Sequence, residues 1–194
     1  MAGPVVHSPP STSRYANFFQ QRIVKSTTHW QRFVADKQTD TPALEQGKTQ
    51  ILRAISFALS SQAAWPAARH LIETFAPYME RRGYWDNWND ILVQAVDAAQ
   101  RFGDMSGQVT MMALLARLMQ RQSRFQEAIP YYRRVIRLAR RTGNRFEAAR
   151  ACSNLGFLYV DTVSRWWRSE ILCCYALAVF EELNSNMSLH YKIR

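Results

Sequence analysis

Residues 101–104, Arg-Phe-Gly-Asp, return as Arg-Thr-Gly-Asn at residues 141–144, so one short segment recurs after 40 residues. Gly103 and Gly143 each follow a stretch in which apolar residues recur every three or four positions, as on one buried face of a helix. Glycine in that place is typical of a helix end, where the backbone turns left-handed. A period of this length built only from helices predicts stacked helix pairs.

The composition of the chain supports an all-α fold. Of its 194 residues 47% are hydrophobic and 12% aromatic, which is enough to build a core, and only seven Gly and seven Pro occur. Strand-like alternation with β-branched enrichment is absent. We predict an all-α, right-handed solenoid of about three helix pairs at residues 67–183, preceded by two leading helices at residues 14–66. Residues 1–13 are expected to form a disordered tail and residues 184–194 to fray.

The net charge and the cysteines narrow the possible partners and the expected cellular setting. A formal charge of +10 favours acidic protein partners, nucleic acid or an anionic membrane surface, or it reflects solvated helix faces that use Arg. No apolar run of about 18 residues occurs, so no membrane span is expected. Cys152, Cys173 and Cys174 lie among apolar neighbours without metal or disulfide spacing. We expect buried thiols and a cytoplasmic setting.

Local signals predict helix boundaries. Thr41 is expected to cap the second helix, with Pro42 at its first position. Pro77 lies inside the third helix and is expected to kink or divide it. Glu73 and Glu80 on that helix are expected to face solvent, as most carboxylates do.

The three predicted helix pairs, which follow the two leading helices and are the third to eighth helices of the chain, resemble tetratricopeptide repeats. In that family the first helix of a pair carries a large residue, Leu, a small residue and Tyr, and the second carries a small residue, an aromatic residue and another small one. The third pair matches the first-helix pattern with Leu155, Gly156 and Tyr159. The second pair matches the second-helix pattern with Ala128, Tyr132 and Val135. Small residues allow neighbouring helices to approach closely.

The 40-residue period resembles the repeat variant of kinesin light chains and of bacterial signal-transducing NTPases. The segment from Asn154 to Tyr159 resembles the Asn-Leu-Gly-x-x-Tyr signature of that variant. The chain departs from the family at Trp88, where a small residue is expected, and lacks the Pro that usually closes each repeat. A phosphate-binding loop ending at residues 47–49 is rejected, because Pro42 stands at its first Gly and no strand precedes it.

The resemblance places the first helix of each pair on a concave, peptide-binding surface. There it implies an amide that holds a peptide backbone, arginines that bind carboxylates, and an aromatic contact. The implied residues are Arg117, Gln120, Arg121, Arg150, Asn154 and Phe157. The alternative is that Asn154 bonds a neighbouring helix and the arginines are solvated.

A second basic surface is expected on the sixth helix, which follows a turn at residues 121–124 and stops at Gly143. Several of its arginines are spaced three, four or eight residues apart and share one broad face, which suits phosphates or acidic partners. The surface consists of Arg133, Arg134, Arg137, Arg140 and Arg141. The alternative is a solvated outer face. Two aromatic clusters, one at residues 84–88 and one at Trp166-Trp167, are expected to pack between repeats, although both tryptophans of the second cannot face inward.

Catalytic patterns are absent from the sequence. The four His are scattered, and no His-x-x-x-His, Cys-x-x-Cys or nucleophile elbow occurs. We therefore predict no enzyme, no metal and no cofactor. The expected function is a scaffold or adaptor that binds a protein or an acidic peptide, and the resemblance implies a place in a bacterial signalling or regulatory assembly. The alternative is a nucleic-acid-binding helical protein. The sequence shows no polar capping helix after Phe180, so self-association or docking to a larger assembly is also expected.

Overall fold

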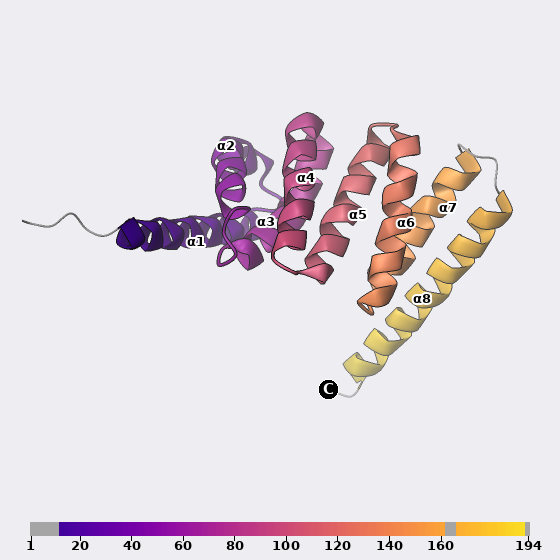
Figure 1. Ribbon diagram of the computed structural model, residues 1–194. Coiled ribbons are helices and arrows are strands. Elements are labelled where there is room, and N and C mark those ends of the chain that lie inside the picture. The colour runs from indigo at the N-terminus through magenta and orange to yellow at the C-terminus, as the bar shows by residue number, and fades with distance from the viewer. Residues whose placement is uncertain (1–11, 162–165, 193–194) are drawn as a thin grey trace, which may run out of the picture. The chain divides into compact units, whose positions relative to one another are not determined.

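The computed structural model describes residues 12–161 and 166–192 (Figure 1). Over these residues all regular secondary structure is α-helical, which confirms the predicted all-α class. The helices are α1 Thr12–Asp36, α2 Thr41–Ala58, α3 Trp65–Arg82, α4 Trp85–Arg101, α5 Met105–Arg121, α6 Phe125–Arg141, α7 Arg145–Asp161 and α8 Trp166–Lys192. The chain divides into two compact units, of which the first ends at Phe75 and the second begins at Ala76.

In the first unit α1 packs against α2. The buried face of α2 carries apolar residues at helical spacing, among them Ile51 and Ile55, which are fully buried. Gly47 lies against two aromatic residues of α1, because a Cβ added there would be 3.2 Å from the ring of Trp30 and 3.4 Å from the ring of Phe33. The glycine thus serves close packing within this unit and not a phosphate loop.

In the second unit each helix from α4 to α8 contacts the next, and α5 also contacts α7 (Figure 1). Its core includes Trp88, Met111, Met112 and Tyr132, each less than 2% exposed. Trp88 therefore fills the interior where the repeat pattern expects a small residue, which confirms the packing role expected of it.

The turns of the second unit recur every 20 residues, twice as often as the sequence echo. Gly83, Gly103 and Gly143 have φ of 74°, 71° and 70°, and Ser123 takes the equivalent place with φ of 59°. After each of these four residues, the next N–H donates to a carbonyl of the helix end, as Asp104 N does to Ala99 O at 2.9 Å. This is the Schellman arrangement, which satisfies carbonyls that the helix leaves without partners.

Small residues set how closely helices approach in the last pair. A Cβ added to Gly156 of α7 would lie 2.7 Å from Cys173 Sγ and 3.3 Å from the main-chain oxygen of Ser169, both on α8. Gly156 therefore occupies a close approach of two helices, as expected of the small position in the repeat pattern.

Three local expectations need correction or extension. The N-cap of α2 is Asp40, not Thr41, since its carboxylate accepts a hydrogen bond of 3.1 Å from Ala43 N. The third helix continues through Pro77 without being divided. Helix α8 continues to Lys192, beyond the predicted end of the repeats, while the fraying of residues 184–194 stays a prediction. The expected disordered tail lies outside the described residues, except that α1 begins at Thr12.

Candidate functional site

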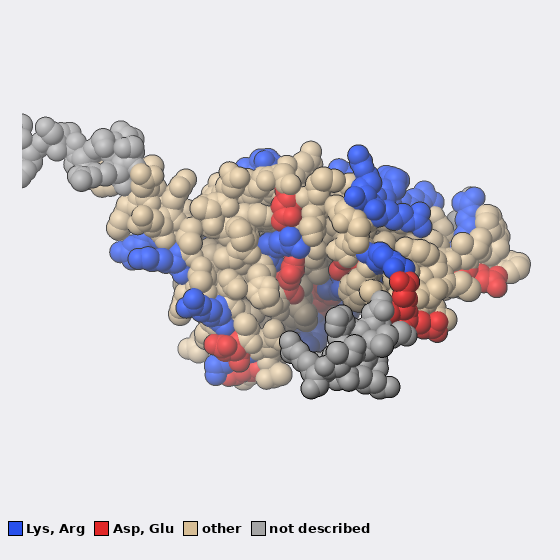
Figure 2. All heavy atoms as spheres, turned by 90° about the horizontal axis from the view of Figure 1, so that it is seen from below, with Lys and Arg blue, Asp and Glu red and all other residues tan. Residues whose placement is uncertain are grey.

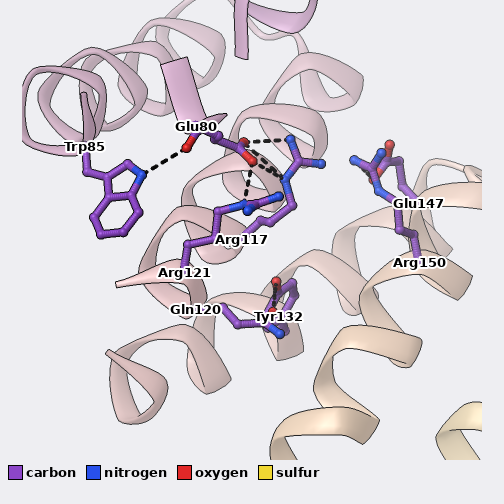
Figure 3. Close-up of polar contacts among 8 residues, drawn as sticks. All are labelled: Glu80, Trp85, Arg117, Gln120, Arg121, Tyr132, Glu147 and Arg150. Carbon is purple, nitrogen blue, oxygen red and sulfur yellow. Dashed lines mark hydrogen bonds and ion pairs between the residues drawn. The ribbon is translucent and has the colours of Figure 1, made fainter. Parts of the chain in front are cut away.

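A buried carboxylate lies among the residues expected on the peptide-binding face. The side chain of Glu80, on α3, is only 3% exposed. Arg117 Nε donates to both of its oxygens at 3.1 Å and Arg117 Nη2 donates to Oε1 at 2.7 Å, while Arg121 Nε lies 2.9 Å from Oε2 (Figure 3). The expectation that Glu80 faces solvent is wrong, because two guanidinium groups of α5 offset the cost of burying its charge.

This cluster gives two of the predicted site residues a structural role. Arg117 and Arg121 tie α5 to the end of α3 through Glu80, and so they neutralise a charge of the protein itself. A carboxylate of a bound peptide would have to compete with Glu80 for them. Their predicted contact with an acidic peptide stays a prediction, and their structural role was not foreseen.

Gln120 also has a partner inside the protein. Its Oε1 accepts a hydrogen bond of 2.7 Å from the hydroxyl of Tyr132, a side chain of α6 that is 1% exposed. Burial raises the pKa of the Tyr132 phenol, against the opposing effect of Arg117 and Arg150. The phenol therefore keeps its proton and remains a donor to Gln120.

The remaining three predicted residues lie on α7. Arg150 Nη2 is 2.9 Å from Glu147 Oε2, one turn earlier on the same helix, and in Figure 3 this pair lies apart from the Glu80 cluster. Asn154 is half-buried, and the side chain of Phe157 is 57% exposed. Since α5 contacts α7, the structure brings the two helices with all six predicted residues together.

The predicted basic surface of α6 divides into two sets of arginines. Arg133, Arg137 and Arg140 line a groove of about 430 Å³ formed with α7 and α8, whereas Arg134 and Arg141 are exposed on the same helix but do not line it. Figure 2 shows basic side chains gathered on one flank of the second unit, with few acidic side chains among them.

Two arginines of this groove are held against tyrosine rings. Arg133 donates to the hydroxyl of Tyr159 from Nε at 2.9 Å and from Nη2 at 2.7 Å, and its guanidinium lies 5.7 Å from the ring centre. The guanidinium of Arg140 lies 5.4 Å from the ring centre of Tyr175. Such cation–π contacts hold the charged ends in place at the rim.

Sequence reasoning missed the contribution of α8 to this groove. Trp166 and Trp167 are 69% and 51% exposed, so the expectation that this cluster packs between repeats is wrong, whereas the expectation that both cannot face inward is confirmed. Trp167 instead lines the groove, with the guanidinium of Arg168 at 4.9 Å from its ring, and Ile171 follows one turn later. The adjacent tryptophans beside an arginine were the signal that pointed to an exposed surface.

The cysteines differ from one another. Cys152 is buried, and burial raises the pKa of its thiol. Cys173 and Cys174 are exposed, so the expectation of three buried thiols is wrong for two of them, although the sulfur of Cys173 lies beside Gly156 of α7. Among the described side chains no group of three or more His, Cys, Asp or Glu is placed to hold a metal ion. Within the same part of the chain no helix has the length and apolar character needed to cross a bilayer.

A similar fold is found in a solved structure. The crystal structure of BtubC (BKLC) from P. vanneervenii aligns with a TM-score of 0.54 and 16% sequence identity, over 85% of this chain and 58% of that one. The chain thus spans little more than half the length of the structure it matches. At this identity the likeness concerns the fold alone. No protein-family profile and no curated protein sequence matches the chain.

Proposed function

We propose that this chain is a protein–protein interaction module, in which tetratricopeptide-like helix pairs form a solenoid and the face of α5 and α7 binds an extended peptide of a partner. The observation that carries the proposal is a stripe on α7. Arg150, Asn154 and Phe157 follow one another at spacings of four and three residues, so they share one helix face.

This stripe, which we call the α7 stripe, offers three kinds of contact. The exposed ring of Phe157 supplies apolar area, the amide of Asn154 both donates and accepts for a peptide backbone, and Arg150 supplies a positive charge. At Glu80 two arginines share one carboxylate, which leaves one positive charge in excess on this face, whereas Arg150 is paired with Glu147, so an acidic peptide would have to compete with these carboxylates. The resemblance to the repeats of signal-transducing NTPases supports an adaptor role in a regulatory assembly.

A capture experiment tests the proposal. The tagged full chain is used to pull proteins from a lysate of its source cell, with nuclease added to half of the sample. We expect one protein to be retained after nuclease, and to be lost with Asn154→Ala and with Phe157→Ser. Val93→Ser is the matched control, because Val93 is an exposed apolar residue of α4, outside the α7 stripe.

Two results would overturn the proposal. If nuclease removes everything that is captured, the alternative of nucleic-acid binding takes its place. If Val93→Ser reduces capture as much as Phe157→Ser does, the α7 stripe is not the binding site.

A further inference from the structure

The groove formed by α6, α7 and α8 has two unlike halves. Along one rim stand three arginines of α6 at spacings of four and three residues, which span about 10 Å along the helix axis. Across the groove α8 contributes Arg168, Trp167 and Ile171. Between the rims the lining is mainly apolar and consists of Ile136, Leu155, Tyr159 and Leu172.

The charge of the groove is one-sided. Of the described residues that line it, four are arginines and none carries a carboxylate. Tyr159 and Tyr175 hold Arg133 and Arg140 at the rim, so these cations are positioned before any ligand arrives. A fixed set of guanidinium groups at helical spacing favours carboxylates that are spaced in the same way.

The apolar half of the groove is also open. Ile171 is 61% exposed and Trp167 is 51% exposed, beside aliphatic side chains of the floor. Exposed apolar side chains gathered next to a recess are typical of a surface that a partner covers. The volume of about 430 Å³ is within the usual range for ligand sites, roughly 300–1,000 Å³, and has room for a few apolar side chains.

We propose that this groove, the α6–α8 groove, binds an acidic amphipathic helix of a protein partner. The partner helix lies along α6 and pairs its carboxylates with Arg133, Arg137 and Arg140, because side chains four and seven residues apart on one helix match that ladder. Its apolar side chains enter the groove against Ile171 and the aliphatic floor. This is the helix-in-groove mode of recognition with an added charge ladder.

A nucleic acid fits the groove less well. Phosphates would pair with the arginines and Trp167 offers a platform for one base, but Ile171 would stay exposed, because an aliphatic side chain offers no platform for base stacking. An acidic amphipathic helix matches both halves. The proposal does not rest on the α7 stripe, since α7 contributes Leu155 and Tyr159 to the α6–α8 groove and other residues to the stripe.

The test uses a fluorescein-labelled probe peptide of about 15 residues, or four helical turns, with Leu on one face and Glu on the flanking positions. Its affinity for the full chain is measured by fluorescence anisotropy. We expect Arg137→Glu to weaken binding by about tenfold or more and Ile171→Ser by several-fold. Arg134→Glu, the same charge change on an exposed residue of α6 outside the groove, should change the affinity less than about twofold.

Further arms separate the alternatives. A probe with Gln in place of each Glu should bind at least about tenfold more weakly, and Asn154→Ala should leave binding of the Glu probe unchanged. Circular dichroism checks that each variant is folded, and Arg137→Gln replaces Arg137→Glu if the latter is not.

The proposal is overturned if the Glu probe does not bind, if the Gln probe binds equally well, or if Arg134→Glu weakens binding as much as Arg137→Glu. It is also overturned if Ile171→Ser has no effect while a random single-stranded oligonucleotide binds in a manner that depends on Arg137. That last result would assign the surface to phosphates.

Discussion

At the scale of single residues, Glu80 is a buried charged residue with a structural role. Its carboxylate is buried at the end of α3, and Arg117, which is 37 residues away in the sequence, donates to both of its oxygens. Removing one partner of a buried ion pair costs more than the pair contributes, because the other charge is left without its partner. Arg117→Glu would add a second carboxylate beside Glu80, so that variant reports on folding and not on peptide binding.

Glu80→Gln is predicted to lower the free energy of unfolding by about 1–3 kcal/mol, since it leaves two guanidinium groups facing a neutral amide. Urea unfolding followed by circular dichroism measures this. The matched control is Glu73→Gln on the same helix, where a partly exposed pair with Arg69 should contribute less than about 0.5 kcal/mol. Equal effects of the two variants would refute the structural role of Glu80.

Gly156→Ala is predicted to destabilise the protein by about 1–3 kcal/mol, because the added methyl group would meet Cys173 Sγ at 2.7 Å. Cys173→Ala removes that sulfur. The double variant should therefore recover part of the loss, leaving the contact of 3.3 Å with the Ser169 carbonyl. A double-mutant cycle by thermal unfolding measures the coupling, and additive effects of the two changes would contradict the close approach.

At the scale of elements, the second unit is built from helices of equal length. Helices α4, α5, α6 and α7 have 17 residues each, and a left-handed residue follows each of the first three. A Cβ added at Gly103 would have no neighbour within 4 Å, so the demand for glycine there comes from the backbone alone.

Substitutions at two of the turn residues, Gly103 and Ser123, should change the stability of the protein in opposite directions. Gly103→Ala is predicted to cost about 1 kcal/mol, because φ of 71° is unfavourable for a residue with a side chain. Ser123→Gly is predicted to stabilise the protein by up to about 1 kcal/mol, since Ser123 holds φ of 59°. Both are measured by urea unfolding. If Ser123→Gly destabilises the protein, backbone strain is not the dominant effect at this turn.

The cap of α2 should make stability depend on pH. The hydrogen bond from Ala43 N, followed by the one from Lys37, holds the pKa of Asp40 below its usual value of 3.8. A carboxyl whose pKa is lowered by folding stabilises the protein above its unfolded pKa, and this contribution is lost as the pH falls through the lowered folded value. We therefore expect Asp40→Ala to have a lower melting temperature than the parent protein at neutral pH, with the difference shrinking below pH 3.8. A difference that is constant across this range would exclude the carboxylate as the cap.

At the scale of the whole molecule, α8 presents an apolar surface that other chains can cover. Trp166, Trp167, Ile171 and Leu177 are each more than half exposed. An exposed apolar patch of this kind favours association. The expected self-association or docking to a larger assembly remains a prediction. Leu177 does not line the α6–α8 groove, so a substitution of Leu177 tests association separately from that groove.

Light scattering at increasing concentration should show dimers or larger species, and Leu177→Lys should shift the equilibrium toward the monomer by at least about tenfold. Val93→Lys, which places the same charge at an exposed apolar position of α4, is the control. A parent protein that stays monomeric at high concentration would contradict the prediction.

The helical part of the fold was predictable from the chain because its signals are local. Apolar spacing and the glycines at 103 and 143 depend on neighbours within a few residues, and they predicted helices that end next to these glycines. The turn at Ser123 was not recognised as equivalent, because its residue type gives no such signal. The sequence predicts Thr41 as the N-cap of α2 and the structure has Asp40, one residue earlier, since both residue types are good caps.

The sequence by itself determined the all-α class and the helix ends that glycine marks, because these follow from short-range periodicity and backbone preference. The tertiary structure alone decided which charged and aromatic side chains are buried. Glu80 is buried because helix packing brings Arg117 and Arg121 to it, and Trp166 and Trp167 are exposed because α8 packs on α7 with only one face. Contacts between residues 37 positions apart depend on how helices cross, and helix periodicity does not encode that geometry.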